Sequence, residues 1–259
     1  MTPKSGSEAA FSGDFVPGEN TYDPRVRVVL IHGSVGNASV WKPVLPALAG
    51  YDVVAPTRGG YPPGPLLEWI DFERQAEELA RELGDGAHLV GHSYGGVIAL
   101  LIAAAQPERV RSLAVSEPPA FALARGNPVV DALVERLAAH FEHGPREPRA
   151  FAEGFLAAVG SNTRLPERLA PELEQGIRAT MAERPPWEAE IPLDVLAAAA
   201  FPTLVVSGAH NAAFDAVCDV LERRLGAERA VLPGAGHSLQ RAPGYGETLR
   251  DFLGRAAGG

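Results

Sequence analysis

Short apolar segments rich in Val, Leu and Ile alternate along the chain with longer segments in which apolar residues recur every three or four positions. Apolar segments with almost no polar interruption are typical of parallel strands that are covered on both faces. The longer segments have the spacing of helices with one apolar face. The alternation predicts an α/β fold, with a mostly parallel, doubly wound sheet and helices on both of its faces. We predict strands at 26–31, 52–55, 88–91, 110–116, 203–207 and 229–232, and helices at 40–49, 69–83, 94–105, 214–225 and 245–254.

The stretch from Pro118 to about Pro192 departs from this alternation. It contains no convincing strand, and its helical patterns lie at 129–143, 148–159 and 166–183. Helices inserted between two strands of a sheet predict a cap over the strand ends, where open α/β sheets bind ligands. The expected organisation is a flexible tail at 1–24, an α/β core at 25–117 and 193–259, and a helical cap at 118–192.

Composition restricts the possible partners. The 259 residues can bury the core of one such domain, and 46% hydrophobic with 21% charged residues is ordinary for a soluble globular protein. The net charge of −9 argues against a nucleic acid or an anionic membrane surface as a partner, so a small-molecule substrate is expected. The oligomeric state is left open.

Membrane, secretion and metal features are missing from the sequence. No apolar run approaches the roughly 20 residues of a membrane span. Residues 1–20 are polar and lack the apolar segment of a signal peptide, which predicts a cytoplasmic protein. Cys218 is the only cysteine, which excludes an internal disulfide and a thiolate metal cluster. The histidines show no metal-ligand spacing, so no metal is expected.

The strongest chemical motif is GHSYGG at 91–96, between a predicted strand and a predicted helix. A serine on so sharp a turn has a strained backbone, and a side chain in place of either glycine neighbour would collide with the strand or the helix. The turn lifts the Ser93 hydroxyl clear of the sheet, at a helix N-terminus that favours developing negative charge. A chance Gly-x-Ser-x-Gly is the alternative, but the strand and helix around it favour Ser93 as a nucleophile.

A candidate base occurs in LPGAGHS at 232–238, after the last predicted strand and before the last predicted helix. A serine hydroxyl needs a neighbouring base, and imidazole is the side chain whose pKa suits neutral pH. A glycine-rich loop at the carboxyl end of a strand can bring His237 over Ser93. We predict His237 as the general base, with a solvated loop histidine as the alternative.

The segment HGSVG at 32–36 follows the first predicted strand. A glycine at this place lets the chain turn back, so that a backbone N–H group, expected to be that of Ser34, faces the site. The N–H group of Tyr94 would be the second donor to an oxyanion. The Ser34 hydroxyl either adds a third donor or only forms the turn.

Together, His32-Gly33, the GHSYG segment and Gly236-His237 resemble the α/β-hydrolase superfamily, over nearly the whole chain from about Arg25 onwards. The RGG segment at 58–60 also looks like the arginine-glycine loop of that superfamily. The resemblance implies the fold, Ser-His chemistry and the absence of a cofactor. It implies no particular substrate, because this fold hosts many reactions.

One position departs from the superfamily pattern. Its members usually carry the triad acid after the strand predicted here at 203–207, where this chain has Asn211. Glu117 ends the preceding strand and resembles relatives, including some haloalkane dehalogenases, whose acid lies there. We predict Glu117 as the acid that orients His237. Two alternatives remain open: Asp215 as the acid, or Asn211 as an orienting residue that cannot stabilise the imidazolium by charge. In either case Glu117 would bond only to local backbone.

Three functions fit these residues. The first is a serine hydrolase that cleaves an ester, lactone or thioester of a small apolar substrate through an acyl-Ser93 intermediate. The second is a cofactor-free lyase, decarboxylase or cyclase that uses the Ser-His pair as acid and base. The third is a non-catalytic receptor for a small molecule on the same fold.

Overall fold

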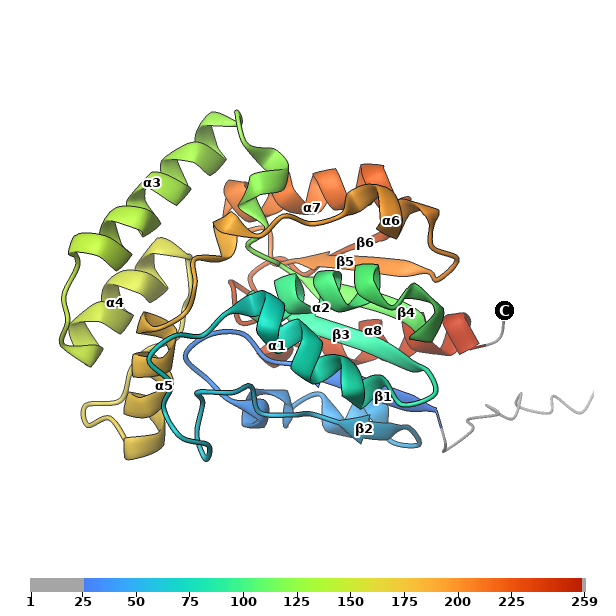
Figure 1. Cartoon of the computed structure of the whole chain (residues 1–259), viewed down its shortest axis with the longest axis horizontal. Helices are drawn as coiled ribbons and strands as arrows, with labels where there is room; N and C mark the ends of the chain where they lie inside the picture. The colour runs from blue at the N-terminus through green and yellow to red at the C-terminus, as the bar shows by residue number, and fades with distance from the viewer. Residues whose placement is uncertain (1–25, 258–259) are drawn as a thin grey trace, which may run out of the picture.

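The computed structural model describes residues 26–257, so the tail predicted at 1–24 lies outside the described residues. Six strands form one sheet in the order β2-β1-β3-β4-β5-β6, and every neighbouring pair is parallel (Figure 1). This confirms the predicted α/β class. The strands are β1 (Arg27–Ile31), β2 (Asp52–Val54), β3 (Ala87–His92), β4 (Val110–Ser116), β5 (Thr203–Ser207) and β6 (Glu228–Val231).

Helices cover both faces of the sheet because its strands are apolar on both sides. Val29 and Ile31 of β1 pack in a cluster with α1, α2 and α7, whereas Val28 and Leu30 pack in a second cluster with α8. Successive side chains of a strand point to opposite faces, so one strand supplies both clusters. The α-helices are α1 (Phe72–Leu79), α2 (Tyr94–Ala105), α3 (Pro128–His143), α4 (Pro148–Ala158), α5 (Pro171–Met181), α6 (Leu193–Ala198), α7 (Ala212–Leu225) and α8 (Tyr245–Ala257).

The helix predicted at 40–49 is wrong. The structure has two short 3-10 helices there, η1 (Ala38–Trp41) and η2 (Leu45–Leu48). Pro43 and Pro46 lack the N–H groups that a continuous α-helix needs, and their rings obstruct the preceding turn. The other 3-10 helices are η3 (Ala80–Leu83), η4 (Pro107–Arg109), η5 (Phe121–Ala124), η6 (Pro186–Glu188) and η7 (Leu239–Arg241).

The chain between β4 and β5 contains α3, α4, α5 and α6 and no strand of the sheet. Helices α3, α4 and α5 stand beyond the carboxyl ends of the strands, on the left of Figure 1. The boundaries of the cap at 118 and 192 stay a prediction. Within residues 26–257, no helix has the length and apolar character that crossing a bilayer requires.

Candidate active site

Ser93 lies on the turn between β3 and α2, with φ at 53° and ψ at −127°. A positive φ is strained for a residue with a side chain. The glycines beside it are required by space: a Cβ on Gly91 would collide with the Gly95 carbonyl oxygen, and a Cβ on Gly95 with that of Ile31. The sequence therefore places the hydroxyl at the N-terminus of α2, above the end of the sheet.

The structure brings Ser93, His237 and Glu117 into one hydrogen-bonded row. The Ser93 Oγ lies 2.9 Å from His237 Nε2, and His237 Nδ1 lies 2.7 Å from Glu117 Oε2. All three residues are at most 7% exposed. With Glu117 ionised, His237 donates from Nδ1, which leaves Nε2 as the acceptor that faces the serine hydroxyl.

Glu117 directly follows β4 and has a left-handed backbone, with φ at 44°. Its Oε1 accepts a hydrogen bond of 2.7 Å from the N–H group of Gly208, after β5. Burial alone would raise the pKa of the carboxyl. Contacts with the imidazoles of His210 and His237, the charge of His237 and the Gly208 N–H group outweigh burial and lower the pKa of Glu117 to about 2. The side chain is therefore an anion at neutral pH.

A second imidazole lies against the same carboxylate. His210 Nδ1 is 3.2 Å from Glu117 Oε1, at an angle unsuited to a full hydrogen bond, and His210 Nε2 is 3.1 Å from the Val159 carbonyl oxygen. The contact with the carboxylate raises the pKa of His210, against the effect of burial. From the sequence, His210 was equally compatible with a pocket wall and with the surface. Its position two residues after Gly208, near the usual place of the acid, was the only indication.

Asn211 and Asp215, the alternatives to Glu117, are used elsewhere. The Asn211 side chain accepts from the N–H group of Ala213 and caps α7. Asp215 forms an ion pair of 3.2 Å with Arg229. Neither forms a hydrogen bond or an ion pair with His237 in the described structure, whereas Glu117 does.

The loop that carries Ser34 passes directly over the nucleophile. A Cβ on Gly33 would lie 2.8 Å from the Ser93 Cβ, so only glycine fits this approach. Ser34 and Tyr94 both line a cavity with Ser93. The Ser34 hydroxyl, the predicted optional third donor, donates instead to Glu183 Oε2 at 2.5 Å. The backbone N–H groups of Ser34 and Tyr94 therefore remain the candidates for an oxyanion hole.

A buried ion pair supports this loop from behind. Arg58 Nη2 lies 2.6 Å from Glu183 Oε1, and the same nitrogen donates to the Gly33 carbonyl oxygen at 3.0 Å. The Tyr61 hydroxyl also donates to Glu183. The sequence singled out the loop of Arg58 but gave no reason to select Glu183, which follows α5.

Two further histidines are structural. His92 Nε2 donates to the His237 carbonyl oxygen at 2.7 Å and so anchors the loop of the base. Burial, followed by the charge of His237, lowers the pKa of His92 to about 3. His32 accepts the Arg58 N–H group at Nε2 and donates from Nδ1 to Gly33. Burial and the neighbouring Arg58 charge hold the pKa of His32 well below its usual value. Both rings are neutral at physiological pH.

Two hollows meet at Ser93 and differ in chemistry. The larger, of about 260 Å³, is lined by His237, by polar and charged residues such as Gln240 and Arg241, and by apolar residues such as Leu165 and Leu173. The smaller, of about 20 Å³, lies toward α3, and His237 is absent from its walls. Its walls are mainly apolar: Phe121, Leu137, Phe141, Phe155, Trp187 and Phe214.

Glu117, His210 and His237 are also the one group of at least three candidate metal ligands within residues 26–257, with ligand atoms within 4.8 Å of one another. A metal ion would have to displace the hydrogen bond of 2.7 Å between Glu117 and His237. The three side chains are therefore arranged to bond to one another and not to surround a metal ion.

A parallel sheet with a strained serine turn after one strand and a histidine on the loop after the last strand defines the α/β-hydrolase fold. The model of the alpha/beta hydrolase family matches residues 28–245. The chain belongs to this family.

Two curated relatives show where the similarity lies. Lipase LipV of Mycobacterium tuberculosis is 30% identical over 238 residues, which cover 83% of this chain and 88% of the lipase. A pimeloyl-acyl-carrier protein methyl ester esterase of Aeromonas hydrophila is 38% identical over 98 residues, 36% of this chain and 39% of the esterase. The match therefore spans about two fifths of that relative.

Solved structures show the same fold at low identity. Carboxylesterase CesB of Bacillus subtilis superposes with a TM-score of 0.64 at 20% identity, over 91% of this chain and 85% of that chain. A haloalkane dehalogenase of Bradyrhizobium elkani gives a TM-score of 0.63 at 23% identity, over 90% of this chain and 91% of that chain.

Proposed function

We propose that the protein is a carboxylic ester hydrolase that cleaves an ester, lactone or thioester through an acyl-Ser93 intermediate. The observation that carries the proposal is the row of contacts from Ser93 Oγ through His237 to Glu117, with distances of 2.9 and 2.7 Å. The names of the relatives, an esterase and a lipase, support the same class of reaction.

The geometry gives each residue a step. Ser93 Oγ attacks the carbonyl carbon and transfers its proton to His237 Nε2, while Glu117 stabilises the imidazolium that forms. The carbonyl oxygen becomes an oxyanion and accepts hydrogen bonds from the N–H groups of Ser34 and Tyr94. The C–O bond to the alcohol then breaks, and the alcohol leaves with the proton from His237. Water, deprotonated by His237, attacks the acyl-enzyme and releases the acid and free Ser93.

The small apolar hollow is the proposed acyl subsite. The leaving alcohol must lie beside His237, which gives it a proton, so the acyl group takes the hollow that His237 does not line. A cavity of roughly 10–15 Å³ holds one water molecule. The volume of about 20 Å³ therefore suits a short acyl group, such as acetyl or propionyl.

Residues 118–192 are the proposed cap of this site. Phe141 of α3, Phe155 of α4 and Trp187 of η6 all belong to this stretch and line the acyl subsite beside Ser93. The core supplies the reacting groups, and the cap supplies most of the apolar wall. Substrate choice therefore depends on the cap.

The test combines covalent labelling with turnover. The protein should react with a fluorophosphonate probe and hydrolyse p-nitrophenyl acetate, and Ser93→Ala should lose both, with a fall in kcat of about 10³-fold or more. Ser39→Ala, on the exposed part of η1, is the matched control and should keep both. Labelling without turnover of any short ester, thioester or lactone would favour the receptor. Loss of a non-hydrolytic reaction in Ser93→Ala would favour the lyase or cyclase.

A further inference from the structure

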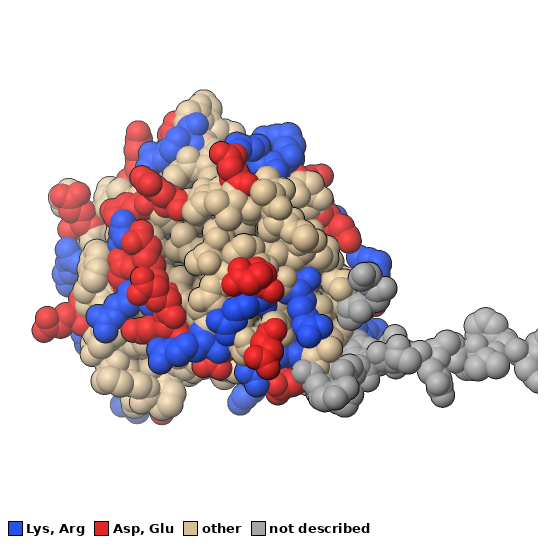
Figure 2. All heavy atoms as spheres, turned by 45° about the vertical axis from the view of Figure 1, so that its right-hand side comes forward, with Lys and Arg blue, Asp and Glu red and all other residues tan. Residues whose placement is uncertain are grey.

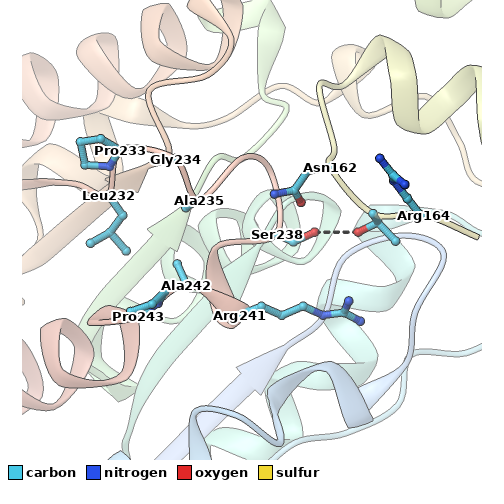
Figure 3. A pocket seen from close by; sticks show the side chains of 11 residues that line it. Asn162, Arg164, Leu232, Pro233, Gly234, Ala235, Ser238, Arg241, Ala242 and Pro243 are labelled. Atoms are coloured by element: carbon cyan, nitrogen blue, oxygen red, sulfur yellow. Dashed lines mark hydrogen bonds between the residues drawn. The ribbon is translucent and has the colours of Figure 1, made fainter.

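Two arginines lie at the open side of the active site, in the walls of a wide hollow of about 660 Å³. Arg164 comes from the segment between α4 and α5, and Arg241 ends η7, after the loop of His237. Both also line the hollow of about 260 Å³ that contains Ser93. In Figure 3 they flank the hydrogen bond of 3.1 Å between Ser238 and Thr163. The two hollows are thus joined where the arginines lie.

Within the part of the chain that the structure describes, no side chain neutralises the positive charge at this place. No Asp or Glu lines either hollow, and neither guanidinium group has an ion pair or a hydrogen bond with another described residue. Some exposed arginines have partners, as Arg178 has in Glu174, and others such as Arg136 have none among the described residues, but neither of these two lines a hollow at Ser93. The face in Figure 2 carries acidic beside basic side chains. In a chain with a net charge of −9, two arginines without acidic partners beside the nucleophile attract anions.

A buried polar group faces the same hollow. Gln240 is 7% exposed, lines the hollow with Ser93, and its Oε1 has no hydrogen-bond partner within residues 26–257. A buried amide oxygen without a partner is costly, so this side of the hollow is polar as well as positively charged.

The position of His237 beside Ser93 decides which half of the substrate lies toward the two arginines. His237 lines the hollow of about 260 Å³ and gives its proton to the leaving alcohol. The alcohol half therefore extends from Ser93 toward Arg164 and Arg241. Resting on the proposed function, we propose that the substrate is a short-chain acyl ester whose alcohol half carries a carboxylate or a phosphate, bound by these two guanidinium groups. Guanidinium binds either anion through paired hydrogen bonds.

The experiment compares acetates that differ in the charge of the alcohol half. We would measure kcat/KM for 4-acetoxybenzoate, for its neutral analogue 4-acetoxybenzamide, and for 4-acetoxyphenyl phosphate. The wild type should prefer the anionic esters by about tenfold at low salt, and the preference should shrink as NaCl rises to about 0.5 M. The ratio between the carboxylate and phosphate esters identifies which anion the site takes.

The variants assign the preference to the two arginines. In Arg164→Gln with Arg241→Gln, the ratio of kcat/KM between anionic and neutral ester should fall to about one. Arg168→Gln removes one positive charge from the segment that also carries Arg164, but Arg168 lines neither hollow, so this control should keep the wild-type ratio. Equal turnover of charged and neutral acetates by the wild type, or an unchanged ratio in the double variant, would refute the anion site and leave the hydrolase intact.

Failure of the proposed function is a separate outcome, seen as no hydrolysis of any acetate. In that case calorimetry with the wild type and the double variant still decides the anion site. Binding of 4-hydroxybenzoate, and not of 4-hydroxybenzamide, that is lost in the double variant would support the site. Equal or absent binding of the two would overturn it.

Discussion

Replacing Glu117 by Gln tests the acid proposed for this site, which follows β4. The carboxylate accepts from His237 at 2.7 Å and from the Gly208 N–H group at 2.7 Å, with His210 at 3.2 Å. A glutamine has one acceptor oxygen and one NH₂ group. If the NH₂ group faces His237, the ring must carry its proton on Nε2, where it can no longer accept the proton of Ser93. If it faces Gly208, two donors oppose each other in a buried place.

The expected loss follows from these two effects. Loss of the tautomer and of the charge that stabilises the imidazolium lowers kcat by about 10³- to 10⁴-fold, equivalent to about 4–5.5 kcal/mol of activation free energy. Glu117 lines neither hollow at Ser93. The KM for p-nitrophenyl acetate should therefore change by about threefold or less, since the carboxylate acts in the transition state.

The assay is the initial rate of p-nitrophenyl acetate hydrolysis over a range of substrate concentrations, with circular dichroism to verify folding. Asp215→Asn is the matched control, because it removes a carboxylate that pairs with Arg229 and not with His237. Adding Asn211→Asp to Glu117→Gln should restore little, since residue 211 caps α7. The reasoning is wrong if Glu117→Gln keeps more than a tenth of the wild-type kcat, or if Asp215→Asn loses as much.

Three further outcomes are expected. His237→Ala should lose nearly as much kcat as Ser93→Ala, and the double variant little more, whereas multiplied losses would show that the two residues act independently. Leu137→Ala should enlarge the acyl subsite and raise the butyrate-to-acetate ratio of kcat/KM; an unchanged ratio would place the acyl group elsewhere. The pKa of the Glu117 carboxyl is about 2 in the folded protein, against an ordinary value of 4.5 that applies to the unfolded chain. As the pH falls, the carboxyl therefore binds a proton in the unfolded chain before it does in the folded protein. The stability it contributes, about 3 kcal/mol, is complete above pH 4.5 and is lost as the pH falls toward 2. Urea unfolding should show a shallower loss over this window in Glu117→Gln.

The strands were predictable because burial on both faces requires continuous apolar runs, which short segments of the sequence display. The strand predicted at 203–207 is β5 (Thr203–Ser207), and that predicted at 229–232 is β6 (Glu228–Val231). The error at 40–49 arose because an apolar helical pattern outweighed Pro43 and Pro46, whose effect on backbone hydrogen bonds is the stronger one.

The site could be predicted as far as it depends on strand ends. Ser93, Glu117 and His237 each follow a strand, and parallel strands bring their carboxyl ends to one edge of the sheet, so their proximity follows from the topology. Glu183 and His210 could not be assigned in this way. Their contacts are with Arg58 and Glu117, 125 and 93 positions away in the chain, and only packing decides such partners.

The contacts behind the Ser34 loop also determine how the site can be reached. Glu183 belongs to the proposed cap and Arg58 to the core, and the backbone around Glu183 pairs with Ile70 of the core. Moving the cap away from the core at this end would separate Arg58 from Glu183 and leave a buried charge without its partner, at a cost of about 3–5 kcal/mol. This cost opposes a movement of the proposed cap away from the core at this end. The hollow that Arg164 and Ser93 both line offers the substrate a route that needs no such movement.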